Sequence, residues 1–185
     1  KAQRTLLLDR AATTAAIRAA LESAVQKAGP DSTLVFYYAG HGIQRQGGSI
    51  IFASYDVQAA TAEKTGLVLS ELLPILKRFK GKRLVLLADC CYSGGLGAVA
   101  KALPNAVALT SADDSNTSTG NWTFSQSVID ALNGSWLCDR NDDGTINMGE
   151  LAAEVKDAMK HREAQQYGYT NNGVSEALVV ANAKK

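Results

Sequence analysis

Two short runs of apolar residues, each followed by a glycine-containing loop, dominate the hydrophobic pattern of the chain. The first spans residues 32–38 and the second spans residues 83–88, and neither alternates between apolar and polar positions. Continuous apolar runs of this length are typical of strands that are buried on both faces of a parallel sheet. A third run of the same kind covers residues 105–110. The pattern therefore predicts a sheet with parallel inner strands.

Segments with helical spacing of apolar residues separate these strands. Four helices are expected, at 9–28, 67–79, 122–132 and 148–161. Thr13 or Thr14 is expected to cap the first helix and Ser70 the second, while residues 94–97 are expected to form a mobile glycine loop. Three short strands are expected in addition, at 6–8, 49–53 (one arm of a hairpin) and 177–180. This alternation predicts an α/β fold with helices on both faces of a mostly parallel sheet.

Composition narrows the class of protein. The chain has 185 residues, of which 46% are hydrophobic and 20% charged, which is typical of one globular domain spanning residues 1–185. A net charge of +1 gives no basic surface for nucleic acid, and no apolar run is long enough to cross a membrane. Three cysteines, two of them adjacent, make a poor disulfide framework. We therefore expect a reducing compartment, the cytoplasm, and the residues at the amino end do not resemble a signal peptide.

A histidine and a cysteine follow the first two predicted strands. His41 lies in the segment Tyr-Tyr-Ala-Gly-His-Gly and Cys91 in the segment Asp-Cys-Cys-Tyr-Ser-Gly. Functional groups of open α/β sheets collect beyond the carboxyl ends of the strands, so the two side chains are expected to be neighbours. A base beside a thiol predicts nucleophilic catalysis, with Cys91 as nucleophile, His41 as base, and the backbone N–H groups of Gly42 and Cys91 as donors to an oxyanion. Taken singly, each residue is more commonly a loop or packing residue.

The two motifs resemble those of a known family. His41 precedes Cys91 by fifty residues, a spacing that caspases share. The chain resembles the metacaspase and bacterial caspase-homologue branch, which carries Tyr-x-Gly-His-Gly and Asp-x-Cys-x-Ser-Gly motifs. The resemblance extends to residues 111–114 and 120–124 and covers most of residues 5–180. It implies a caspase-like three-layer sandwich and a cysteine endopeptidase that acts on proteins or peptides.

The resemblance also implies roles for individual residues. The family nucleophile lies two residues after the acid, which selects Cys91, and strand alternation turns Cys90 into the core. Asp89 is implied to line the pocket for the residue before the scissile bond, where a carboxylate selects Arg or Lys. Asp113 or Asp114 is expected to add a second charge there or, alternatively, to serve as a turn residue.

One departure from the family pattern concerns the amino end. Caspase-like domains open with a strand and a helix that precede the segment at residues 6–8, and this chain starts too late to contain them. An unpaired place in the sheet is therefore expected, which is costly for buried backbone groups. A shortened chain and a separate amino-terminal fragment that completes the sheet are both compatible with this pattern.

A second motif occupies residues 139–150 and matches the twelve-residue calcium loop D-x-[DN]-x-[DN]-G-x5-E. Gly144 takes the position of the sharp turn. The expected ligands are the side chains of Asp139, Asn141, Asp143 and Glu150 and the carbonyl oxygen of Thr145. The ion would have a structural or an activating role, because the dyad chemistry itself needs no cofactor. The alternative is an acidic loop that caps the following helix without a metal.

Functions of other classes remain open at this stage. A pseudo-peptidase, or a calcium-responsive scaffold that docks protein partners, would keep the fold without using the dyad. An acyl hydrolase or a transpeptidase would use the same dyad on another substrate. Rapid alkylation of Cys91 that slows on replacement of His41 distinguishes the catalytic alternatives from the scaffold.

Overall fold

A four-stranded sheet forms the centre of the molecule. The computed structural model describes residues 3–184, and the strand order is β1-β5-β6-β8. The inner pairings are parallel, as predicted, and β8 runs antiparallel to β6. These strands are β1 (Thr33–Ala39), β5 (Arg83–Asp89), β6 (Ala106–Thr110) and β8 (Gly168–Asn172).

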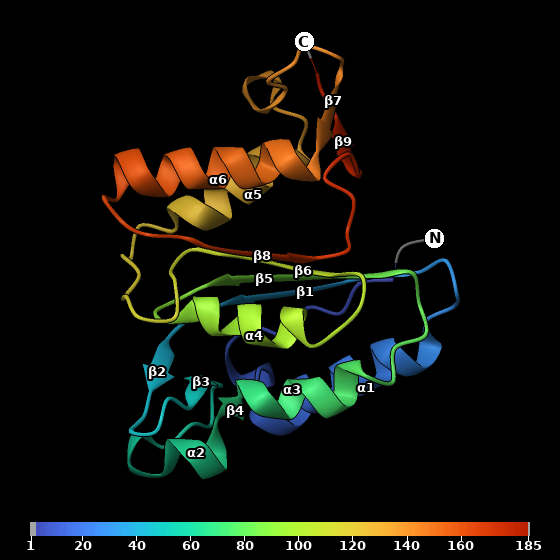
Figure 1. Ribbon diagram of the computed structural model, residues 1–185. Helices are drawn as coiled ribbons and strands as arrows, with labels where there is room; N and C mark the ends of the chain where they lie inside the picture. Colours follow the sequence, from blue (N-terminus) through green and yellow to red (C-terminus); the bar gives the residue numbers. More distant parts are fainter. Residues whose placement is uncertain (1–2, 185) are drawn as a thin grey trace.

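Helices cover both faces of the sheet (Figure 1), so the predicted three-layer arrangement is confirmed. On one face lie α1 (Thr14–Lys27), α3 (Leu69–Leu76) and α4 (Leu96–Lys101). On the other lie α5 (Thr123–Leu132) and α6 (Met148–Arg162). Strand β5 supplies both cores in alternation: Leu86 and Ala88 pack in the first, and Val85 and Leu87 pack in the second. This is why the strand is apolar throughout.

Smaller elements flank the sandwich. A three-stranded antiparallel sheet contains the expected hairpin and consists of β2 (Gly42–Gln44), β3 (Ile50–Phe52) and β4 (Leu67–Val68). A two-stranded ribbon joins β7 (Thr145–Asn147) to β9 (Val179–Asn182). The other short elements in the described residues are α2 (Ala62–Thr65) and the 3₁₀ turns at Asp9–Ala11, Ala59–Thr61, Ser93–Gly95 and Trp136–Cys138.

Two predictions of local structure are wrong, a strand at residues 6–8 and a helix cap at Ser70. Residues 6–8 form no strand, and Leu6 and Leu8 are 63% and 62% exposed. Ser70 does not cap the second helix, because Leu67–Val68 pairs with β3 and helix α3 begins at Leu69. The cap of α1 is correctly placed, since the Thr13 side chain accepts a hydrogen bond from Ala16 N.

The glycines of residues 94–97 do not give the mobile loop that the sequence predicts. The segment forms a 3₁₀ turn that continues into α4. A Cβ atom on Gly94 would lie 2.4 Å from the carbonyl carbon of Asp113, and one on Gly97 would lie 2.6 Å from the Thr170 hydroxyl. The prediction is wrong because these glycines permit close packing.

Strand β1 is an edge strand within residues 3–184, because its only partner is β5. Val35 and Tyr37, on one face of β1, are 56% and 46% exposed. The unpaired place in the sheet thus lies along β1 in these residues. None of the helices in the described residues combines the length and the apolar character that a membrane span requires.

Gly94→Ala should lower the free energy of unfolding by about 1–3 kcal/mol, because the added methyl group meets backbone atoms that cannot rotate away. Gly120→Ala is the matched control, since nothing lies within 4 Å of the position that its Cβ atom would take. Urea denaturation of both variants measures the difference. Equal stability of the two variants would mean that residue 94 lies in a loosely packed loop after all.

Candidate active site

The candidate site lies where β1 and β5 end side by side. Ala39 is in register with Asp89, and Gly40 N donates to Asp89 O at 3.2 Å. His41 and Cys91 each follow two residues later. A Cβ atom on Gly42 would lie only 1.8 Å from the carbonyl oxygen of Cys91, so the two loops are in backbone contact. The strand pairing thus brings the two predicted catalytic residues to one edge of the sheet.

The backbone of His41 is fixed from two sides. Its carbonyl oxygen accepts a hydrogen bond from Ala53 N at 2.9 Å, and the Tyr38 hydroxyl donates to it at 2.9 Å. The Tyr38 ring is stacked on Phe52 with a centroid separation of 4.3 Å. A Cβ atom on Gly40 would lie 2.5 Å from the Tyr38 hydroxyl, which explains the glycine before the histidine. The imidazole itself is exposed, on a rigid support.

Cys90 and Cys91 have different environments. Cys90 is 2% exposed and packs in the first core, where burial, followed by the nearby Cys91 and Asp89, raises its pKa. Cys91 is half-buried, and its Sγ accepts a hydrogen bond from Ser118 N at 3.3 Å. No hydrogen bond joins the His41 imidazole to Cys91 Sγ in the described residues, and such contacts commonly form only with substrate bound. Cys91 is therefore the accessible thiol of the pair.

Within residues 3–184, the two N–H groups predicted to bind the oxyanion have no competing partner. Ala53 N donates to His41 O, and Arg45 N donates to Ser49 O. The odd-numbered residues of this segment therefore form the hydrogen-bonded pairs with the β3 side, and Gly42 lies between two of them. By this alternation, Gly42 N–H faces away from β3. The Cys91 N–H has no hydrogen-bond partner among residues 3–184.

Asp89 is the last residue of β5 and is 2% exposed. Its Oδ2 accepts two hydrogen bonds from Ser125, one from the backbone N at 3.1 Å and one from Oγ at 2.6 Å. Ser125 lies in the first turn of α5, where a carboxylate is favoured by the helix dipole. No ion pair to Asp89 is found among the described residues. The carboxylate is thus buried without a cation.

The segment at residues 111–122 packs against the loop that contains Cys91. Asp113 Oδ1 accepts hydrogen bonds from Ser115 N, Ser115 Oγ and Asn116 N at 2.7–2.8 Å. Partial burial raises the pKa of Asp113, but these bonds outweigh burial and hold the pKa below its usual value. Asp114 is exposed, and its carbonyl oxygen accepts from Gln44 Nε2 at 3.1 Å. The Asp113 carboxylate therefore stabilises the turn in which it lies.

Sequence reasoning missed the residues that hold this segment in place. Gln165 donates to Ser111 O and to Ser118 Oγ and accepts from Thr119 N. Glu163 accepts hydrogen bonds from Asn121 and Thr123. Neither these residues nor Ser125 lies in a recognisable motif, and only the packing of α6 and α5 on the sheet brings them to the site.

The predicted calcium loop has the expected backbone. Gly144 has a φ angle of 85°, Thr145–Asn147 forms β7, and Asn147 caps α6 in a capping box with Glu150. Asp139 accepts hydrogen bonds from Asp143 N and Gly144 N at 3.1 and 2.9 Å. The Thr145 hydroxyl and amide, together with Asn141, lower the pKa of Asp143.

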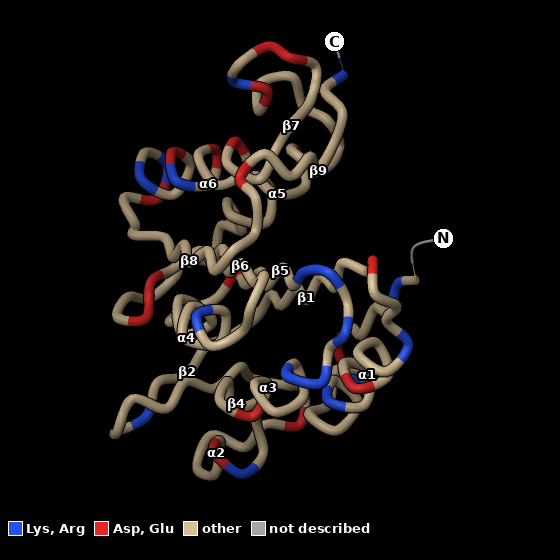
Figure 2. The backbone as a smooth tube through the Cα atoms, turned by 45° about the vertical axis from the view of Figure 1, so that its right-hand side comes forward, with Lys and Arg blue, Asp and Glu red and all other residues tan. Residues whose placement is uncertain are grey.

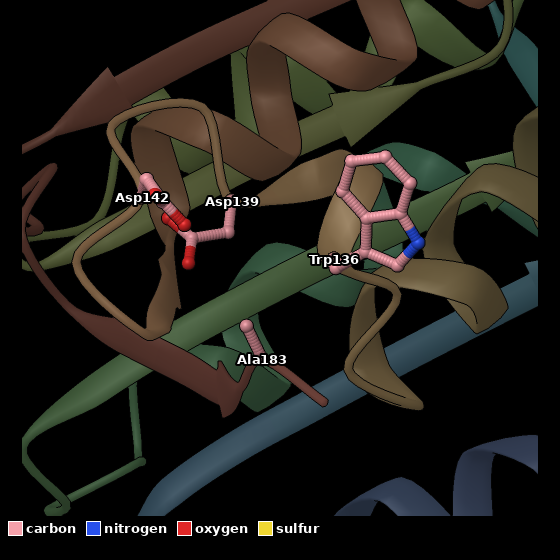
Figure 3. A pocket seen from close by; sticks show the side chains of 4 residues that line it. All are labelled: Trp136, Asp139, Asp142 and Ala183. Carbon is pink, nitrogen blue, oxygen red and sulfur yellow. The ribbon is translucent and has the colours of Figure 1, made fainter. Parts of the chain in front are cut away.

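The side chains of this loop bond to its own amides. Glu150 accepts from Arg140 N at 2.9 Å and Asn147 N at 2.9 Å. In residues 3–184, no group of three or more His, Cys, Asp or Glu side chains is placed to hold a metal ion. The oxygen donors fit calcium in kind, and their present arrangement also fits a loop that caps a helix. Beside it lies a hollow lined by Trp136, Asp139, Asp142 and Ala183 (Figure 3).

Comparison with known proteins agrees with the fold and the motifs. A solved structure, protein GSU0716 from Geobacter sulfurreducens, is similar in fold, with a TM-score of 0.63 at 13% sequence identity over 97% of this chain and 83% of that one. No curated protein matches the sequence. Residues 1–100, which contain both His41 and Cys91, match the family described as metacaspase, peptidase C14 domain. The chain belongs to this metacaspase family of cysteine peptidases.

Proposed function

We propose that the protein is a cysteine endopeptidase that cleaves after Arg or Lys, with Cys91 as nucleophile and His41 as general base. The observation that carries the proposal is that β1 and β5 end side by side, so that the loops of His41 and Cys91 are in backbone contact. Cys91 is the accessible thiol, and the high pKa of buried Cys90 disfavours the alternative nucleophile. Peptidase family membership supports the same reaction class.

The proposed reaction has two stages. His41 takes the proton of the Cys91 thiol, and the thiolate attacks the carbonyl carbon of the substrate. The N–H groups of Gly42 and Cys91 donate to the resulting oxyanion. The C–N bond then breaks as His41 protonates the leaving amine, which leaves a thioester on Cys91. His41 next takes a proton from water, the hydroxide attacks the thioester, and the acid product leaves with Cys91 restored.

The proposed specificity rests on Asp89. A buried carboxylate without a cation is unfavourable unless a ligand supplies one. Between residues 84 and 139 the sequence contains a single basic residue, Lys101, and Figure 2 shows the basic run at residues 77–83 before β5, whereas the site follows β5. A substrate Arg or Lys would therefore be the cation that Asp89 lacks. As a further part of the proposal, Asp113 or Asp114 would add a second negative charge to the pocket.

The unpaired edge of β1 supports a further part of the proposal. A separate amino-terminal fragment that adds a strand there would cover the exposed side chains of Val35 and Tyr37. It would also satisfy the free backbone groups of the strand, as β-augmentation does in other proteins.

We also propose that calcium binds at residues 139–150 and stabilises the carboxyl-terminal part of the fold. Asp139, Asn141, Asp143, the Thr145 carbonyl and Glu150 would hold the ion once Glu150 turns from the loop amides. The loop lies at the start of α6, whose 15 residues span about 22 Å, and the candidate active site lies towards the other end of this helix (Figure 1). This separation favours a structural role over a direct catalytic one.

Cys91→Ala should abolish peptide cleavage and leave the fold intact, because no thioester can form. Cys90→Ala should keep most of the activity. His41→Ala should reduce the rate by about 10²–10⁴, the usual contribution of general acid–base catalysis. Turnover of an Arg-containing fluorogenic peptide measures all three. Activity that survives in Cys91→Ala but not in Cys90→Ala would reverse the assignment of the nucleophile.

Asp89→Asn should lower kcat/KM for Arg and Lys substrates by about 10²-fold or more, because the charge is lost while an oxygen remains to accept from Ser125. Iodoacetamide alkylation of Cys91 should be nearly unchanged. A peptide library profiles the residue before the scissile bond in both proteins. A parent profile that favours Asp would refute the assigned role of Asp89.

Calcium should raise the melting temperature of the parent protein, by an increment equivalent to about 2.7 kcal/mol at a hundredfold excess over its dissociation constant. Glu150→Gln should lose most of this gain, whereas Glu63→Gln, an exposed glutamate in α2, should keep it. Calorimetry with calcium and with chelator tests both variants. If calcium does not change the melting temperature of the parent protein, helix capping would be the only role left for this loop.

A further inference from the structure

The buried carboxylate of Asp89 is only half available to a ligand. A carboxylate has about four lone-pair positions, two on each oxygen. Oδ2 accepts the backbone N–H and the hydroxyl of Ser125, so both of its positions are filled. No hydrogen bond to Oδ1 is found among residues 3–184. One oxygen is therefore left for a substrate side chain.

The hydroxyl of Ser125 is held in this role by a second hydroxyl. Ser125 Oγ lies 2.6 Å from the Tyr37 hydroxyl and has one hydrogen, which it donates to Asp89. Tyr37 must therefore be the donor in its contact with Ser125. Burial raises the pKa of Tyr37, and the charge of Asp89 adds to the rise against the effect of the Ser125 bond. The phenol thus keeps its proton at neutral pH, and the chain of bonds runs from Tyr37 through Ser125 to Asp89.

The free oxygen decides how the carboxylate meets each kind of basic side chain. Arginine gains most from a carboxylate that offers both oxygens to its fork of N–H groups, whereas lysine binds as a point charge and needs one oxygen. With Oδ2 filled, a guanidinium cannot bond to both oxygens of the carboxylate, whereas an ammonium still has the one oxygen that it needs. The expected advantage of Arg over Lys is correspondingly reduced.

We propose that Ser125 is a specificity-determining residue, which fills Oδ2 of Asp89 and so makes the site accept Lys and Arg at comparable rates. The inference rests on the proposed function, because it concerns the same substrate pocket. Ser125 acts through Asp89, and no hydrogen bond joins it to Cys91 in the described residues. Its effect is therefore expected in the ratio of the two substrates, and a general loss of stability would not move this ratio.

The test compares kcat/KM for two peptides that differ only in Arg or Lys before the scissile bond. The parent protein should use them within about tenfold of each other. Ser125→Ala should raise the ratio of Arg to Lys by about tenfold, because one position on Oδ2 becomes free for a second guanidinium N–H. Ser127→Ala is the matched control, since it removes another buried hydroxyl from α5 that has no hydrogen-bond partner among the described residues, and its ratio should equal that of the parent.

The outcomes separate this inference from the proposed function. A parent protein that cleaves both peptides but prefers Arg more than a hundredfold would overturn the inference alone, even if Ser125→Ala failed to fold. An unchanged ratio in a folded Ser125→Ala, with Cys91 alkylated at the parent rate, would do the same. A parent protein that cleaves neither peptide faster than a matched peptide with Gln at that position would overturn both.

Discussion

The hydrogen-bonded register between β1 and β5 is the constraint on which the candidate site depends. Because the two strands are parallel and Ala39 pairs with Asp89, both chains leave the sheet at the same level. The glycines at positions 40 and 42 then allow the loop of His41 to approach the loop of Cys91 at backbone distance. A one-residue slip would turn Asp89 and its neighbours to the opposite faces of the sheet. The buried apolar faces of β5 on both sides make such a slip costly.

Three consecutive residues at the end of β5 have three separate roles. Asp89 faces α5 and bonds to Ser125, Cys90 faces the first core, and Cys91 lies beyond the strand against Ser118. The alternation of side chains along a strand is enough to separate the acid from the buried thiol. The same alternation makes Asp89 part of the packing between the sheet and α5. If Asp89 has its proposed role, substrate recognition and the stability of this helix terminus are linked through one carboxylate.

The sequence predicted the features that local pattern determines. The apolar runs gave β1, β5 and β6, and the helical spacing gave α1, α5 and α6 to within a few residues, apart from the start of α1. Strand β8 was missed because its residues, Gly168–Asn172, are mostly polar and pair on one side only. The glycines before α4 were misjudged because contacts with distant residues, such as Asp113, decide their role. Ser125 and Gln165 could not be found for the same reason, since tertiary packing alone places them at the site.

We propose that the ends of β1 and β5 combine a reactive Cys91 with a pocket for a basic side chain. Labelling with a peptidyl chloromethyl ketone that carries Arg next to the reactive group, followed by peptide mapping, tests both parts at once. We expect a single adduct on Cys91 that forms about a hundredfold faster than with the matched Asp reagent, because the buried carboxylate of Asp89 repels a second carboxylate. An adduct on Cys90 or Cys138, or equal rates for the two reagents, would contradict it.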